Sequence, residues 1–304
     1  MSIFKKKKIC VTHNGAFHAD DLFATATLSI LNNGNIKIVR TRDPKMFAKG
    51  DYVYDVGGEN DSERNKFDHH QKGGAGEREN GIPYSAFGLV WKTYGEKICE
   101  DKAVADYIEK KIVEPLDAVD NGFDIIIPKI GDVTPYSASA IFLANYPTWE
   151  EDSDNIDRIF EEEVKRIIPL LKREIEVAKS SVRGKKIIID TYNKSENKEI
   201  IVLDKPLPRF LIQDVLPEFR EPIYFVYPSK HGDSWKVEAV RKDLTVHESR
   251  KLFPEPWRGL MNKDPRLEDM TGIQDFTFCH PSGFFAHVES KEGAIALAEK
   301  ALLS

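Results

Sequence analysis

The first half of the chain alternates short apolar runs with segments of helical spacing, and this alternation constrains its fold more than any other feature. The runs and segments span residues 8–12, 20–31, 36–40, 52–56, 85–94 and 101–119. Such a rhythm predicts a mostly parallel sheet with helices on its faces. Ligands of these sheets bind beyond the carboxyl ends of the strands, so residues directly after strands are the first candidates for a functional site.

The second half has a different pattern. A charged segment over 151–186 carries apolar residues at spacings of three and four, which predicts a long amphipathic helix, interrupted or bent near Pro169. After Gly184 we expect four strands and a final helix, over residues 187–192, 199–203, 223–227, 235–240 and 291–303. The fold class is therefore α/β, with a catalytic domain over 1–150, a connecting helix over 151–186 and a smaller α+β domain over 187–304.

Composition excludes several classes of protein. The 304 residues include 44 Lys and Arg against 50 Asp and Glu, and the net charge of −6 disfavours general binding of long polyanions. No apolar run approaches the roughly 20 residues that cross a bilayer. The N-terminus has no signal-type apolar stretch, so we expect a cytoplasmic protein. Cys10, Cys99 and Cys279 are widely spaced and predict buried free thiols, not disulfides or a thiolate zinc site.

Four of the eight histidines lie within the first 70 residues, and each has an acidic neighbour. His13, His18 and Asp20 follow the first strand-like run, and the triplet Asp68-His69-His70 forms a second group. Imidazole and carboxylate together suit divalent ions such as Mn, Zn or Fe, which indicates hydrolytic metal chemistry. Each residue alone also has a structural interpretation, because Asp20 can cap a helix and His13 can lie in a core.

Two more acids stand beside turn residues. Asp55 follows a strand-like run and precedes Gly57-Gly58, and Asp120 precedes Asn121-Gly122. Either acid alone can be a plain turn former. The order of all four groups resembles the DHH phosphoesterase superfamily, whose motifs converge on two metal ions.

Five segments resemble, more closely, the melanocyte proliferating gene one family, which is associated with RNA exonuclease activity. They lie at 12–20 (THNGAFHAD), 67–71 (FDHHQ), 118–122 (AVDNG), 254–260 (PEPWRGL) and 279–284 (CHPSGF). The resemblance runs from Thr12 to about Leu297 and implies a DHH-like catalytic domain. It implies metal ligands at His13, Asp20, Asp55, His69 and Asp120, and we add His18 as a further candidate ligand. It also implies that His70 faces the substrate phosphate, and we assign catalytic roles to His70 and Asp68.

The sequence departs from the superfamily in two places. Many members have an Asp in the middle of the first motif. This sequence has His18 instead, one residue later, and histidine is still a residue type that binds metals. Phe285-Ala286-His287 stands where close relatives tend to have Ile-Gly-Gly, so larger side chains would restrict backbone approach there. The glycine-rich stretch over 73–81 is expected to be a flap beside Asp-His-His or a plain surface loop.

We expect the C-terminal domain to grip the substrate. Its candidate residues are Arg241, Arg250, Lys251, Trp257, Arg258 and His280. Arginine binds phosphate with two parallel hydrogen bonds, and tryptophan stacks on bases. The alternative is a solvated face with a core tryptophan.

These residues lead to one main hypothesis and two alternatives. The main hypothesis is a metal-dependent phosphodiesterase, an exonuclease that hydrolyses nucleotides from short RNA or DNA ends. It would use two divalent ions, Mn first and Mg, Zn or Fe as alternatives, with His70 as general acid or cationic clamp. The alternatives are a small-molecule phosphoesterase acting on pyrophosphate or dinucleotides, and a metal-binding regulatory module without turnover. A homo-oligomer is left open.

Overall fold

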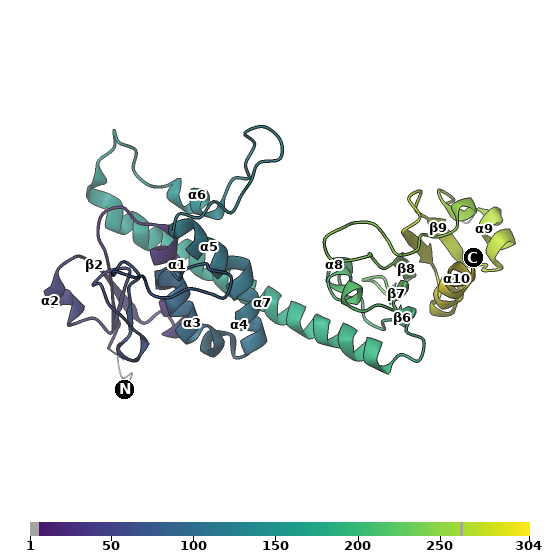
Figure 1. Cartoon of the computed structure of the whole chain (residues 1–304), viewed down its shortest axis with the longest axis horizontal. Helices are drawn as coiled ribbons and strands as arrows, with labels where there is room; N and C mark the ends of the chain where they lie inside the picture. Colours follow the sequence, from purple (N-terminus) through teal and green to yellow (C-terminus); the bar gives the residue numbers. More distant parts are fainter. Residues whose placement is uncertain (1–5, 262–263) are drawn as a thin grey trace. The chain divides into compact units, whose positions relative to one another are not determined.

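The computed structural model describes residues 6–261 and 264–304, apart from the side chain of Ser153. Contacts within the chain divide it into two compact units, Met1–Lys179 and Ser180–Ser304. Unit 1 is coloured purple to teal and unit 2 green to yellow in Figure 1. Each unit contains its own five-stranded sheet.

The sheet of unit 1 is mostly parallel. Its strands, in spatial order, are β2 (Ile36–Arg40), β1 (Lys8–Thr12), β3 (Tyr52–Tyr54), β5 (Lys66–Phe67) and β4 (Asn60–Asp61). The first four strands run parallel, and the edge strand β4 is antiparallel to its neighbour. This arrangement confirms the predicted α/β class with a mostly parallel N-terminal sheet. It also brings the carboxyl ends of β1, β3 and β5 to one edge.

Helices of unit 1 pack beside this sheet. They are α1 (Ala19–Leu31), α2 (Pro44–Phe47), α3 (Ala86–Cys99), α4 (Lys102–Ile108), α5 (Glu114–Asp120) and α6 (Ala138–Leu143). Helix α1 is buried over Ala19–Ser29, because its apolar and small residues cover every face. A π-helical turn, Glu109–Val113, joins α4 to α5. Pro115 explains this wide turn, because it has no N–H to donate and its ring excludes the carbonyl four residues earlier.

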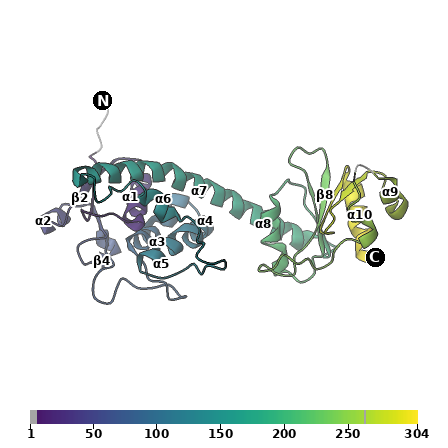
Figure 2. The same ribbon diagram turned by 90° about the horizontal axis from the view of Figure 1, so that it is seen from above.

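Helix α7 (Ile156–Lys194) spans 39 residues and belongs to both units. Its first part lies along the edge strand β2 (Figure 2). Residues of both elements line a cleft. The helix continues through Pro169 and through Gly184, so the strand predicted over 187–192 is wrong. Gly184 is a point of close packing, not the end of the helix, because a Cβ atom there would clash with Cδ2 of Leu211.

The sheet of unit 2 is mostly antiparallel. Its strands, in spatial order, are β6 (Ile200–Val202), β7 (Tyr224–Pro228), β8 (Trp235–Ala239), β10 (Phe285–Val288) and β9 (Phe276–Cys279). Its helices are α8 (Arg209–Gln213), α9 (Pro265–Thr271) and α10 (Lys291–Leu303). Strands β6, β7 and β8 and helix α10 confirm the predictions made for those segments. The α10 side of the sheet carries a large apolar core that includes Tyr224, Phe253, Trp257 and Leu297.

The cysteines and the helix lengths can be compared with the predictions made from composition. Cys10, Cys99 and Cys279 are free and buried, as predicted. Within 6–261 and 264–304, no helix combines the length and the apolar character that a membrane span requires.

Candidate metal centre

The histidines and acids of the N-terminal motifs converge at the carboxyl edge of the unit 1 sheet. His13 directly follows β1, Asp55 follows β3, and Asp68-His69-His70 follows β5. Asp20 lies in the first turn of α1, and Asp120 ends α5. Residues far apart in sequence meet there, because parallel strands end at the same edge of the sheet.

Asp55 is the centre of the cluster. Its Oδ2 lies 3.0 Å from Nε2 of His13, and its Oδ1 lies 3.3 Å from Nε2 of His69. The two oxygens of one carboxylate therefore face two different histidines. The backbone of Asp55 has φ +56°, in the left-handed region that aspartate tolerates better than most residues. Strained backbone of this kind is concentrated at functional sites.

His69 marks the second half of the cluster. Its Nε2 lies 3.4 Å from Oδ2 of Asp120 and 4.0 Å from Oδ2 of Asp20. The same nitrogen is buried and has no hydrogen-bond partner among the described residues. His69 is thus surrounded by carboxylates without donating a hydrogen bond to any of them.

Some carboxylates of the cluster have neither a hydrogen-bond donor among the described residues nor a full counter-charge, and this indicates whether the cluster suits a cation. Both oxygens of Asp20 are buried and have no hydrogen-bond partner in the part of the chain that the structure describes. Burial, with repulsion from Asp55 and Asp120, raises the pKa of Asp20 well above its usual range. Burial likewise raises the pKa of Asp120. A buried charge is normally paired or bound to a metal, so these atoms fit a divalent ion.

Contacts with histidines have the opposite effect on Asp55. Burial opposes its ionisation, but the contacts with His13 and His69 outweigh burial and lower its pKa to about 2. Burial also opposes ionisation of His13, which on its own would lower its pKa. Contacts with Asp21 and Asp55 outweigh burial and raise the pKa of His13 to about 10. A proton on His13 thus balances part of the negative charge when no metal is bound.

Three overlapping groups of side chains offer sets of metal ligands. They are His13, His18 and Asp55; Asp55, His69 and His70; and His18, Asp20 and Asp120. Within each group the ligand atoms lie within 4.8 Å of one another. Asp55 and His18 each belong to two groups. Nitrogen and carboxylate oxygen without thiolate suit Mn, Zn or Fe, so this donor set fits a divalent metal ion.

Asp68 and His70 form a pair at the rim. Oδ1 of Asp68 accepts the backbone N–H groups of His69 and His70 and lies 2.8 Å from Nδ1 of His70. Its Oδ2 accepts the backbone N–H of Gly58. Both oxygens of Asp68 are therefore used inside the protein, whereas the His70 side chain is 62% exposed. Asp68 thus orients His70 through Nδ1, and Nε2 lies on the opposite edge of the ring.

Asp21 is a site residue that the motifs did not single out. Its Oδ2 is buried without a hydrogen bond to the described residues and lies 3.3 Å from Nε2 of His13. Its Oδ1 accepts the backbone N–H of His18, which caps the start of α1. The sequence signal for Asp21 is the pair Asp20-Asp21. One acid is enough to cap a helix, so the second acid is left without a structural explanation.

Arg40 supports the turn that carries the first motif. Its guanidinium donates to the carbonyl of Gly15 at 2.7 Å and pairs with Asp157 at 2.6 Å. It also lies over the ring of Phe160, 4.6 Å from the centroid. The first turn of α7 is thereby tied to the turn between His13 and His18. An arginine at a strand end gave no sequence signal of this role.

The candidate substrate residues lie in unit 2 and have varied surroundings. Arg250 donates to the carbonyls of Pro217, Arg220 and Pro222, and Lys251 donates to the carbonyl of Leu302. Both cations thus bind backbone of their own unit. Arg258 donates from Nε to the carbonyl of Phe253.

The other three candidates differ in exposure. Trp257 is 4% exposed and packs against Phe253 and Phe276 in the core, so its ring has no face open to a base. His280 is partly buried, and its ring lies 4.6 Å from that of Phe284. Arg241 has a buried Nε without a hydrogen-bond partner among the residues described.

The fold and the cluster define an α/β protein whose mostly parallel sheet carries a histidine–carboxylate centre fit for a divalent metal ion. The family model MYG1_exonuc, described as "Uncharacterised protein family (UPF0160)", matches residues 8–302, and the chain belongs to this MYG1 family. The resemblance drawn from the motifs is confirmed.

Relatives in the family match over nearly the whole chain. MYG1 exonuclease of Homo sapiens is 31% identical, over 96% of this chain and 85% of its own. MYG1 exonuclease of Bos taurus is 32% identical, over 96% of this chain and 84% of its own. The MYG1 protein YER156C of Saccharomyces cerevisiae is 30% identical, over 97% of this chain and 96% of its own.

Among solved structures, RecJ of Thermus thermophilus in complex with Mn²⁺ aligns with a TM-score of 0.27 and 12% identity. The alignment covers 98% of this chain and 52% of the RecJ chain, so this chain spans about half of that protein.

Proposed function

We propose that this protein is a metal-dependent phosphodiesterase, an exonuclease that removes nucleotides from short RNA or DNA ends. The observation that carries the proposal is the position of Asp55, whose two oxygens face His13 and His69. The mammalian relatives with 31–32% identity are named exonucleases, which supports this choice among phosphoesterases.

Two divalent ions fit the way the ligands divide around Asp55. His13 lies toward its Oδ2, and His69 lies toward its Oδ1 with Asp120 beyond. We propose Mn for both positions, with Mg, Zn or Fe as alternatives. When bound, such ions supply a water of lowered pKa and balance the charge of phosphate oxygens.

The protein's own residues orient the substrate and move the proton. His70 is held by Asp68 through Nδ1, so its Nε2 edge is free to contact a phosphate or leaving oxygen. It acts as general acid toward the leaving oxygen or as a cationic clamp on the phosphate. Asp68 is a positioning residue in this scheme, because both of its oxygens are engaged by the protein.

Unit 2 contributes substrate recognition in this proposal. Arg241, Arg258 and His280 are its candidate phosphate contacts, whereas Arg250 and Lys251 bind backbone carbonyls and Trp257 packs in the core. The functional division into residues 1–150, 151–186 and 187–304 is part of the proposal. The net charge of −6 favours short substrates over long duplexes. The cytoplasmic location and a homo-oligomeric state stay predictions.

The test is turnover of an end-labelled short RNA by the manganese-loaded protein, with inorganic pyrophosphate as a parallel substrate. Stepwise shortening by the parent, and none by Asp20→Asn, would support the exonuclease. Glu163→Gln is a matched control, because Glu163 is a buried acid of unit 1 bonded to Asn145 and Arg166. Release from pyrophosphate alone would replace the proposal by small-molecule hydrolysis. Metal binding without turnover of either substrate would refute the proposal that the protein is an enzyme.

A further inference from the structure

We propose that Arg78 and Asp117 are positioning residues that hold Asp120 opposite His69, an inference that rests on the proposed metal centre. Neither residue touches the centre itself. Arg78 follows His70 by eight positions, and Asp117 precedes Asp120 by three. The pair thus joins the two chain segments that supply His69 and Asp120.

Arg78 is a buried cation with several fixed partners. Its Nη2 lies 2.6 Å from Oδ2 of Asp117 and 2.6 Å from Oε1 of Glu109, and its Nε donates to the same Glu109 oxygen. Its Nη1 donates to the carbonyl of Pro83, and its guanidinium lies 4.2 Å from the ring centroid of Tyr84. Only 7% of the side chain is exposed. Such a planar fork fixes geometry in a way that lysine does not reproduce.

Asp117 is the matching buried anion. Its Oδ1 accepts the Ser85 hydroxyl at 2.6 Å and the backbone N–H of Gly88 at 3.0 Å, and its Oδ2 accepts Arg78. The carboxylate is packed against the start of α3. A Cβ atom on Gly88 would overlap its Oδ2, so only glycine leaves room for it.

Further bonds fasten the same two segments. The loop after His70 folds back on itself through a bridge between Glu77 and Pro83. Asn80 of this loop donates to Glu114 at the start of α5. Arg78 also grips Glu109, the first residue of the π-helical turn that leads into α5. The loop and the helix that ends at Asp120 are therefore held as one piece.

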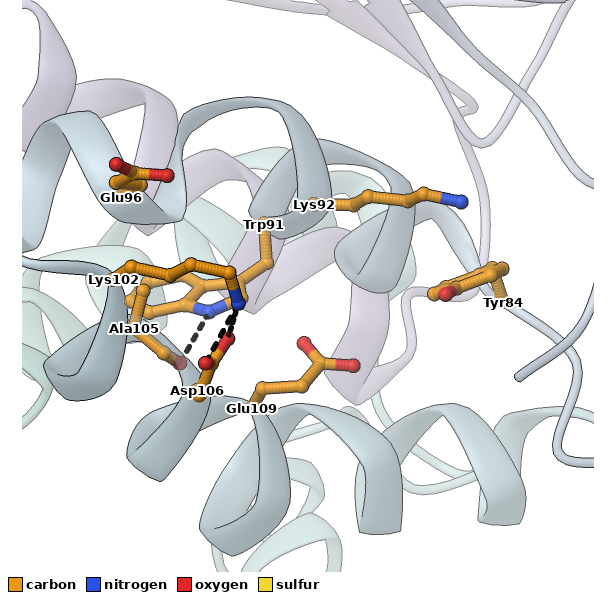
Figure 3. A pocket seen from close by; sticks show the side chains of 8 residues that line it. All are labelled: Tyr84, Trp91, Lys92, Glu96, Lys102, Ala105, Asp106 and Glu109. Atoms are coloured by element: carbon orange, nitrogen blue, oxygen red, sulfur yellow. Dashed lines mark hydrogen bonds and ion pairs between the residues drawn. The ribbon is translucent and has the colours of Figure 1, made fainter. Parts of the chain in front are cut away.

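A cleft borders the outer side of this network. Glu109 and Tyr84 line it together with Trp91 and Lys92, and its volume is about 260 Å³ (Figure 3). Water can therefore reach the Glu109 side, whereas the Asp117 side is fully buried. Substitutions of Arg78 leave Glu109 a route to solvation. The expected effect then falls on Asp117 and the helix that carries Asp120.

The experiment measures manganese affinity by isothermal titration for the parent, Arg78→Lys, Asp117→Asn and the double variant. Arg78→Lys keeps the charge and loses the fork, and Asp117→Asn keeps an acceptor for Ser85 and Gly88. Each single change should raise the dissociation constant about tenfold or more, as for other residues that orient metal ligands. The double variant should lose little beyond the single ones, because both changes break the same contact.

Glu163→Gln controls for general loss of stability, since Glu163 is equally buried but outside this network. Its dissociation constant should stay within about twofold of the parent. An equal loss in Glu163→Gln, or unchanged affinity in Arg78→Lys and Asp117→Asn, would overturn the inference.

A second readout needs no metal. Hydrogen exchange of the metal-free protein reports the amides of Asn121, Gly122 and Phe123, which bond back to α5. These amides should exchange faster in Arg78→Lys and not in Glu163→Gln, and unchanged rates would refute the positioning role. If the parent binds no manganese, the metal centre fails while the exchange rates still decide the role of Arg78.

Discussion

Replacing Asp20 by asparagine should stabilise the metal-free protein while abolishing metal binding. The Asp20 carboxylate is buried, has no hydrogen-bond partner among the described residues and is repelled by Asp55 and Asp120. An unsatisfied buried polar group costs about 1–3 kcal/mol, and more when it is charged. At about 2–4 °C per kcal/mol for a unit of this size, relief of about 1–3 kcal/mol by removal of the charge should raise the melting temperature by about 2–12 °C.

The effect should depend on pH in a defined direction. Because the pKa of Asp20 is raised in the folded state, the folded protein binds more protons than the unfolded chain above pH ~4. The free energy of unfolding of the parent therefore falls as pH rises from about 4 toward the folded-state pKa. Asp20→Asn removes the contribution of Asp20 to this dependence, so its advantage over the parent grows from acid toward neutral pH.

Manganese should reverse the order of stability. At about 100 times its dissociation constant, a bound ion adds about 2.7 kcal/mol to the free energy of unfolding of the parent. Asp20→Asn should gain almost nothing. Thermal unfolding with chelator and with manganese, at several pH values, measures both effects. Glu163→Gln should be less stable in both conditions, because Oε1 of Glu163 already accepts hydrogen bonds from Asn145 and Arg166.

The reasoning would be refuted by a metal-free Asp20→Asn protein that melts below the parent while manganese still raises its melting temperature. Such a result would mean that Asp20 is satisfied in the metal-free state and is not a ligand.

Four further predictions concern three histidines of the metal cluster and one tryptophan of the unit 2 core. His69→Ala should bind manganese too weakly to retain it on a desalting column, and full metal retention would exclude His69 as a ligand. His70→Ala should lower turnover of end-labelled RNA by about 100-fold or more. It should change manganese affinity less than about twofold, so a parallel loss of both would make His70 a ligand. Manganese binding near pH 7 should release protons, because the pKa of His13 is about 10 without metal and the ligand must be neutral. Calorimetric heats that do not depend on the buffer would contradict this. Trp257→Ala should destabilise the protein by about 3–5 kcal/mol in urea unfolding, and a smaller loss would argue against its core position.

The sheet order of unit 1 was predictable only in kind. Periodicity located β1, β2 and β3, because their apolar runs are bounded by turn residues. The two-residue strands β4 and β5 are too short to give any period. Strand β5 pairs with β3 and β4 pairs with β5, and sequence spacing does not encode these pairings.

The error over 187–192 has a physical cause. Ile187, Ile188 and Ile189 are β-branched and favour strands by propensity, and Gly184 precedes them as a helix breaker would. In the structure Ile188 is buried with Leu211 on one face of α7, whereas Ile189 is 37% exposed on another. Packing of one helical face against α8 outweighs local propensity.

The candidate metal centre was predictable to the extent that its candidate ligands come from motifs. His13, Asp55, His69 and Asp120 do meet, as the resemblance implied. The residues that support them were not foreseen, because Arg40 and Arg78 act through contacts with distant backbone and acids. Such contacts depend on the folded chain and leave no local pattern.

Asp117 and Asp120 are three residues apart, and this spacing indicates more than the turn that Asp120-Asn121-Gly122 predicts. In a helix, residues three apart lie on neighbouring positions of one face, so two acids at this spacing repel unless each has its own partner. Here Asp117 is neutralised by Arg78, while Asp120 faces His69. An aspartate that only forms a turn needs no buried arginine as its partner. It also needs no glycine on a neighbouring helix to make room for its carboxylate. Gly88 and Arg78 therefore distinguish an anchored pair from an ordinary Asp-Asn-Gly turn, and they do so because a buried carboxylate needs both space and a counter-charge.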